Sequence, residues 1–176
     1  MNRQWILVIF LVCLLSACSI GQVNEPVNGQ DVLPTEEDQV SALELAAEAA
    51  LIEFFNQLNQ GEYENAVELY GGSYEELEYF NPGMDPDDRA GLLAAACEFN
   101  GFFCLSVSSV TAIESGSQHP LLFEVSYVNP DGSRFVLGPC CGATEEEMPP
   151  VDVFIVRVNC KTGGECQVLE LPPYVP

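Results

Sequence analysis

Beyond residue 40 of this chain of 176 residues, the hydrophobic pattern changes once, near Phe103. Between residue 41 and Phe103, apolar residues recur every three or four residues, which is the spacing of amphipathic helices. After it, apolar and polar residues alternate and β-branched residues become frequent, as is typical of strands. Helices followed by a run of antiparallel strands predict an α+β domain, in which the helices pack on one face of a single sheet.

The first helix is expected to begin at a capping box, with Ser41 as the N-cap and Glu44 three residues later. Residues 18–40 are polar, acidic and interrupted by glycine and proline, so we expect a flexible tether there. The folded domain is therefore expected to span residues 41–176, and its first helix to end near Asn59. The apolar face of this helix is expected to contain Leu45, Ala49, Ile52, Phe55 and Leu58.

Three shorter helices are expected before the strands begin, separated by glycines and by a loop that contains proline. In the last of them, Asp85 is expected to be the N-cap and Pro86 the first helical residue, with acidic residues in the first turn. The expected ranges are 62–70, 73–80 and 85–97.

Turn-forming sequences divide the second half of the chain into strands. Asn129-Pro-Asp-Gly132 and Thr162-Gly163-Gly164 each lie between two apolar, alternating segments, which is the pattern of a β-hairpin. Residues 138–150 are rich in glycine, proline and glutamate, and we expect a loop there. The expected strands are 105–113 (with a bulge at Ser108-Ser109), then 121–128 paired with 134–137, and 151–159 paired with 167–171.

Residues 1–17 have the parts of a secretory signal peptide. Arg3 lies near the start, an unbroken apolar run extends from Trp5 to Leu15, and the small residues Ser16 and Ala17 follow. The apolar run is shorter than the roughly 20 residues that a membrane-spanning helix needs. The pattern therefore predicts an exported protein.

The residues at the end of this leader, Leu15-Ser-Ala-Cys18, resemble the lipobox of bacterial lipoprotein precursors. The resemblance implies cleavage before Cys18, a diacylglyceryl group on its sulfur and an acyl chain such as palmitate on the new N-terminus. Two or more acyl chains give stable attachment to a bilayer. We therefore expect a lipoprotein of the cell membrane or outer membrane, with its domain on the extracytoplasmic side. The alternative is a plain signal peptide with another cleavage site.

The chain beyond residue 17 is strongly acidic, with 27 acidic residues, four basic ones and a net charge of −23. Nucleic-acid binding needs a basic surface that neutralises phosphates, so we do not expect this chain to bind nucleic acid. It equally disfavours docking on anionic lipid headgroups. The simplest interpretation is a soluble acidic surface, with basic partners or cations left open.

Six cysteines remain after Cys13, in the leader, and Cys18, the expected lipid attachment site: Cys97, Cys104, Cys140, Cys141, Cys160 and Cys166. An even number of cysteines in an exported chain predicts disulfides first. Cys160 and Cys166 lie across an expected hairpin turn, and Cys97 and Cys104 flank the Asn100-Gly101 turn, so each pair can close locally.

Cys140 and Cys141 are adjacent, which leaves two interpretations. They form either a vicinal disulfide or two bridges to other elements. Zinc binding is the less favoured interpretation of the six cysteines, because the chain has no Cys-x-x-Cys and a single histidine.

The segment from Leu58 to Tyr70, with its Gly61-x-Tyr63-x-x-Ala66 pattern after a long helix, resembles the start of small exported NTF2-like (cystatin-like) domains. The resemblance implies a cone in which a curved sheet closes over the helices around a pocket. It implies no reaction, because this fold hosts enzymes, binding modules and assembly domains. The six cysteines and the 138–150 loop depart from the family, and the tryptophan usual in its last strand is missing.

Residues with catalytic or metal-binding chemistry are few. His119 precedes Pro120 in an expected loop; we interpret it as a surface residue, with an enzyme that uses His119 and a nearby carboxylate as the alternative. Asp85, Asp87 and Asp88 have the oxygen ligands that calcium prefers, but the glycine and closing glutamate of an EF-hand are missing, so a helix start is favoured. The run 145–147 of glutamates is expected to be solvated, and no sequence motif for a cofactor or a nucleophile occurs.

These observations favour a non-enzymatic, lipid-anchored cell-envelope protein that acts in binding or assembly. Its partner is expected to be an envelope protein or a small apolar ligand. Aromatic residues of the helical half are expected to fill the core, and the alternative is that some line an apolar pocket. They are Phe54, Phe55, Tyr63, Tyr70, Tyr79, Phe80, Phe99, Phe102 and Phe103.

Overall fold

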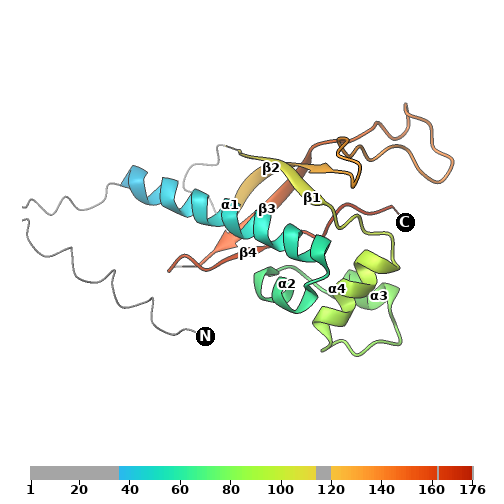
Figure 1. Ribbon diagram of the computed structural model, residues 1–176, viewed down its shortest axis with the longest axis horizontal. Coiled ribbons are helices and arrows are strands. Elements are labelled where there is room, and N and C mark those ends of the chain that lie inside the picture. The colour runs from blue at the N-terminus through green and yellow to red at the C-terminus, as the bar shows by residue number, and fades with distance from the viewer. Residues whose placement is uncertain (1–35, 114–119, 162, 176) are drawn as a thin grey trace, which may run out of the picture. The chain divides into compact units, whose positions relative to one another are not determined.

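The computed structural model describes residues 36–113, 120–161 and 163–175. Within these ranges, four helices precede four strands, so the predicted α+β class is confirmed (Figure 1). Among the residues described, no helix has both the length and the apolar composition needed to cross a bilayer. The elements are α1 (Glu36–Gln60), α2 (Tyr63–Leu69), α3 (Glu75–Phe80), α4 (Arg89–Glu98), β1 (Ser106–Ala112), β2 (Leu121–Val128), β3 (Phe154–Cys160) and β4 (Cys166–Val168).

Helix α1 begins before the predicted capping box, at Glu36, so Ser41 lies inside the helix and the expected tether ends earlier than residue 40. The predicted apolar face is also partly wrong, because Leu45 is 65% exposed. The buried face of α1 consists of Ala47, Leu51, Phe54, Phe55 and Leu58.

Helix α4 begins after the predicted position. Asp88 is its N-cap, and its side chain accepts a hydrogen bond from the Gly91 N–H. Asp85 instead starts a turn, in which its side chain accepts from the Asp87 N–H and its carbonyl accepts from the Asp88 N–H. Pro86 therefore occupies the second position of a turn, which also suits its fixed φ angle, and does not begin the helix.

The sheet is antiparallel and open, with the strand order β1-β2-β3-β4. The register between β1 and β2 shifts between Val107 and Ser109, which confirms the predicted bulge. Helix α1 lies along one face of the sheet, as Figure 1 shows, and contacts all four strands. Along β2 and β3, the alternate residues Phe123, Val125, Val156 and Val158 are buried beneath the helices.

The hairpin predicted after β2 forms its turn and only a short stretch of pairing. The Gly132 N–H donates to the Asn129 carbonyl, Arg134 bridges to Val128, and the Phe135 N–H donates to the Tyr127 carbonyl. Leu137 forms a second isolated bridge, to Val151. Phe135 turns inward, where its ring packs against those of Phe103 and Phe154. The chain then leaves the sheet for the loop of residues 138–150, and the strand beside β2 is β3. The second predicted hairpin, β3–β4, forms with shorter strands than expected.

Most of the predicted aromatic core is present. Phe54, Phe55, Tyr70 and Phe102 are buried, and Tyr63, Phe80 and Phe103 are partly buried against the same cluster. Tyr79 and Phe99 are each 80% exposed, which corrects their predicted place in the core. In α3 the buried residue is Leu77, and Tyr79 lies two residues further round this short helix; Phe99 follows the end of α4.

Two disulfides, Cys97–Cys104 and Cys160–Cys166, lie in the described part of the chain. The first ties the end of α4 to the segment before β1, and the second joins β3 to β4. Neither of these disulfides contains Cys140 or Cys141. Their Sγ atoms face each other at 2.7 Å.

Candidate functional site

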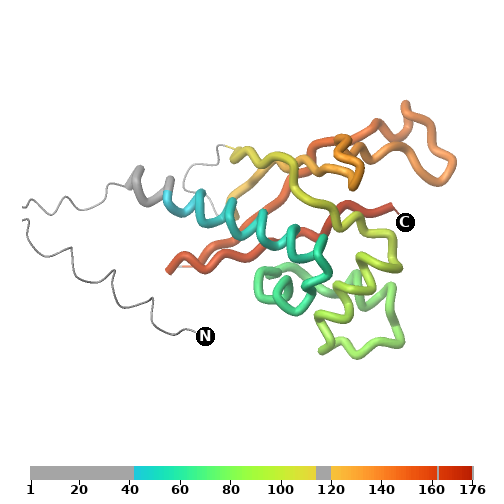
Figure 2. Tube along the Cα trace, viewed as in Figure 1, coloured from blue at the N-terminus to red at the C-terminus, as the bar shows by residue number. Residues whose placement is uncertain are grey.

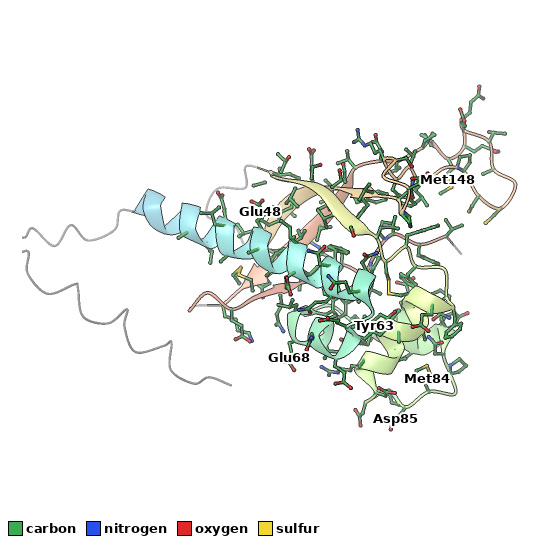
Figure 3. The ribbon with its side chains drawn as sticks, in the orientation of Figure 1. Glu48, Tyr63, Glu68, Met84, Asp85 and Met148 are labelled. Atoms are coloured by element: carbon green, nitrogen blue, oxygen red, sulfur yellow. A yellow bond between two sulfur atoms is a disulfide. The ribbon has the colours of Figure 1, made fainter. Side chains whose placement is uncertain are left out.

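A groove of about 510 Å³ runs between the start of α2 and the first turns of α4. We call it the α2–α4 groove. Figure 3 shows Tyr63 where these two helices meet. The groove is open on the α4 side because the residues there have small side chains, and acidic residues also line it. The small residues are Ala90, Gly91 and Ala94, and the carboxylates are Glu62, Glu64 and Asp88.

The end of α1 places the α2 side of the groove. Gly61 has a φ of 76°, a conformation that glycine adopts without strain, and it stops the helix. The Glu62 N–H then reaches back to the Gln57 carbonyl at 2.8 Å, and the Gly61 N–H to the Leu58 carbonyl at 3.2 Å. Asn65 donates to the Glu62 carboxylate at 3.0 Å. The first acidic side chain of the groove is therefore held by its neighbour in α2.

Tyr63 connects α2 to the far end of α4. Its hydroxyl donates to the Glu98 carboxylate at 3.3 Å. Burial and the nearby negative charge of Glu98 both raise the pKa of the Tyr63 phenol. Tyr63 is therefore a neutral hydrogen-bond donor whose proton is already engaged, and its role in the groove is structural.

Gly91 allows the Asp88 carboxylate to fold over the first turn of α4. A Cβ on Gly91 would lie 2.3 Å from the Asp88 Oδ2 atom, so no other residue fits without moving that carboxylate. Asp88 Oδ1 accepts from the Gly91 N–H at 3.0 Å. The carboxylate of Asp88 thus both caps the helix and lines the groove.

The groove carries negative charge that its own lining does not neutralise. No basic side chain is among the described residues that line it. Arg89 is the basic residue of α4, and its guanidinium lies over the Tyr74 ring, 5.2 Å from the ring centre. The arrangement suits a ligand that brings positive charge and hydrogen-bond donors.

A second cleft, of about 350 Å³, lies between the loop before α3 and the chain that leaves β4. Its Tyr70 hydroxyl donates to the Ser73 carbonyl at 2.9 Å, and burial raises the pKa of this phenol. Glu170, also in its lining, forms an ion pair with Arg157. Two of the polar groups of this cleft, the Tyr70 hydroxyl and the Glu170 carboxylate, are thus already paired, and we place no chemistry there.

The residues predicted to carry chemistry are not brought together. Cys18 and His119 lie outside the described residues. Asp85 caps a turn and Asp88 caps a helix, as described above. The Glu147 carboxylate accepts hydrogen bonds from the N–H and hydroxyl of Thr144, and these bonds lower the pKa of Glu147. Within the described part of the chain, no group of three or more histidine, cysteine, aspartate or glutamate side chains is arranged to hold a metal ion.

The sequence analysis missed the α2–α4 groove, although it contained a signal for it. Ala90, Gly91 and Ala94 recur at helical spacing and make one face of α4 small. The segment around Gly61 was interpreted as the end of one helix and the start of the next, and its acidic residues Glu62 and Glu64 received no role. Comparison with protein families, with curated proteins and with solved structures finds no match to this chain.

Proposed function

We propose that this protein is a lipid-anchored cell-envelope protein that binds a positively charged segment of an envelope partner in the α2–α4 groove. It acts by binding and performs no catalysis. The observation that carries the proposal is the groove itself: three carboxylates surround a floor of small residues. The chain beyond the leader also has a negative net charge, so the protein attracts cationic partners from a distance.

The anchor follows from the leader, whose Leu15-Ser-Ala-Cys18 sequence lies directly after the apolar run. Acyl chains on Cys18 would fix the acidic domain at a membrane surface, where its partner is also confined. A modest affinity then suffices, because confinement raises the effective concentration of each molecule.

Metabolic labelling with an alkyne-tagged fatty acid tests the anchor. The full chain is expected to incorporate the label, and Cys18→Ser is expected to lose it. Cys13→Ser is the matched control, since it removes a cysteine of the leader and is expected to keep the label. Labelling that persists in Cys18→Ser, or a mature N-terminus elsewhere, would contradict the anchor.

Binding of a lysine-rich peptide to the full chain in detergent tests the groove. The double variant Glu62→Gln, Glu64→Gln removes two charges and retains the hydrogen-bonding atoms. Exposed ion pairs contribute about 0.2–1 kcal/mol each, so the peptide is expected to bind about 2- to 30-fold more weakly. Higher salt is expected to reduce the difference, because it screens exposed charges.

The matched control is Glu145→Gln, Glu146→Gln, which makes the same change in net charge in the 138–150 loop. This control is expected to bind the peptide as the native chain does. If the two double variants lose affinity equally, binding depends on net charge alone and the groove is not the site.

We also infer that the domain is a diverged NTF2-like domain. The support is the long helix α1 across one sheet face, followed by α2 with Ala66 fully buried in the Gly61-x-Tyr63-x-x-Ala66 pattern. An experimental structure tests this relationship. A sheet that curves around α1 would support it, whereas a flat sheet that leaves α1 on its outer surface would refute it.

A further inference from the structure

The loop of residues 138–150 is closed at its base. The Leu137 N–H donates to the Val151 carbonyl at 2.7 Å, and the Val151 N–H donates to the Leu137 carbonyl at 2.9 Å. Figure 2 shows this loop extending away from the helices. A surface loop of this length with its ends joined is an Ω-loop, a class that is frequently functional.

Cys140 and Cys141 lie in a tight turn of this loop. The Ala143 N–H donates to the Cys140 carbonyl at 2.9 Å, and the two residues between them, Cys141 and Gly142, have φ angles of 61° and 90°. Positive φ at both central positions is the type I′ turn, which normally takes glycine, asparagine or aspartate. Cys141 is the one non-glycine residue with positive φ in the described parts of the chain. Backbone strain of this kind concentrates at functional sites.

The turn brings the two Sγ atoms to 2.7 Å from each other, close to the 2.0 Å of a disulfide bond. Little movement therefore separates the two thiols from a bonded pair. Their surroundings differ from those of the other cysteines: Cys97, Cys104, Cys160 and Cys166 pack against the hydrophobic core, whereas Cys141 is exposed and Cys140 partly exposed.

We propose that Cys140 and Cys141 form a reversible redox site, which exchanges two electrons with the disulfide of a small molecule or a partner protein. In the oxidising direction, the Cys141 thiolate attacks the incoming disulfide. A bond forms between Cys141 Sγ and one incoming sulfur, and the other sulfur leaves and takes a proton. The Cys140 thiolate then attacks Cys141 Sγ, and the second incoming sulfur leaves as a thiol. The pair loses two protons and two electrons, and the incoming disulfide gains them and becomes two thiols.

The order of attack follows from the geometry. Cys141 is the more exposed of the two, so it meets the incoming disulfide first. The neighbouring Cys141 sulfur raises the pKa of the Cys140 thiol, which keeps Cys140 protonated before the reaction. That influence is lost once Cys141 has become part of a mixed disulfide, so Cys140 ionises more readily for the second step.

Reversibility follows from the adjacency of the two residues. Consecutive Cα atoms are about 3.8 Å apart across a trans peptide, below the usual 4.4–6.8 Å of a disulfide. The closed ring is therefore strained, and strained, exposed disulfides are the ones that are readily reduced. The core-packed disulfides are expected to resist the same reductant.

Equilibration of the full chain in buffers of increasing reduced-to-oxidised glutathione ratio tests the site. Each sample is alkylated, and its peptides are weighed. The peptide with Cys140 and Cys141 is expected to gain two alkyl groups as the ratio rises, and to lose them when the series is reversed. Over this range, Cys97–Cys104 and Cys160–Cys166 are expected to stay protected and serve as internal controls.

Single variants test the exchange step. Cys140→Ser is expected to accumulate a glutathione adduct on Cys141, because the second thiol is missing, whereas the native chain releases glutathione. The proposal is overturned if the pair is alkylated at every ratio, if it opens only together with the core-packed disulfides, or if Cys140→Ser forms no adduct. It is also overturned if oxidation links two chains and leaves no internal bond between Cys140 and Cys141.

Discussion

Replacing Tyr127 with phenylalanine is expected to stabilise the domain. Tyr127 is 1% exposed, and its ring packs edge-on against Phe55 at 5.2 Å and against Phe154 at 5.5 Å. Its hydroxyl is buried without a hydrogen-bond partner among the described residues. A buried polar group in this state costs about 1–3 kcal/mol of desolvation, which the Tyr127→Phe change removes while it keeps the ring.

Tyr70→Phe is the matched control, because the chemical change is identical and the expected sign is opposite. The Tyr70 ring is also buried, stacked on Phe54 at 5.6 Å, but its hydroxyl donates to the Ser73 carbonyl. Loss of this bond is expected to cost about 0.5–1.5 kcal/mol. Both variants keep a buried aromatic ring, so a difference in their stability reports whether the lost hydroxyl had a hydrogen-bond partner.

Thermal unfolding of the full chain in mild detergent, with its disulfides intact, measures both changes. At about 2–4 °C per kcal/mol, the melting temperature is expected to rise by about 2–12 °C in Tyr127→Phe and to fall by about 1–6 °C in Tyr70→Phe. A Tyr127→Phe variant that melts at or below the native temperature would refute the reasoning, because its hydroxyl would then contribute a favourable interaction.

Three other changes test separate parts of the structure. Gly91→Ala is expected to lower stability by about 0.5–2 kcal/mol, although alanine favours helices, because its Cβ displaces the Asp88 cap; a higher melting temperature would contradict this. Replacing Cys97 and Cys104 with serine is expected to cost about 2–4 kcal/mol, and an unchanged denaturation midpoint would argue against a stabilising bridge. Burial raises the pKa of Tyr127, so the unfolded chain loses the phenol proton at a lower pH than the folded chain does. The free energy of unfolding is therefore expected to fall as the pH rises above about 10. Denaturation at several pH values is expected to show a smaller fall in Tyr127→Phe.

Local sequence patterns were sufficient to predict an element where its structure depends on residues close to it in the sequence. The β1 bulge, the β3–β4 hairpin with its disulfide, and the stop of α1 before Gly61 are all set within a few residues. In each case a few adjacent residues specify either a backbone conformation or a disulfide between cysteines close in sequence. These elements were therefore predicted in nearly their observed places.

Predictions failed where two adjacent signals competed or where distant residues decide the outcome. Both Asp85 and Asp88 are good caps, and the turn over Pro86 decides between them. The segment after Gly132 resembles a strand, but it pairs with β2 only near the turn, at Val128 and Tyr127, because β3 pairs with the rest of β2. The α2–α4 groove joins two helices that the sequence separates. The small residues of α4 are a local signal for one of its sides, but no local pattern identifies the helix opposite them.

The distribution of charge explains why the groove stays negative. The described core contains no charged side chain, so the acidic excess lies on the surface. The four basic residues beyond the leader are each engaged elsewhere: three form ion pairs with Asp152, Glu170 and Glu165, and the fourth, Arg89, lies over Tyr74. Because none of them lines the groove, the partner that we propose is what would bring positive charge opposite Glu62 and Glu64. A partner without basic groups would bury these carboxylates unpaired, at a cost that disfavours binding.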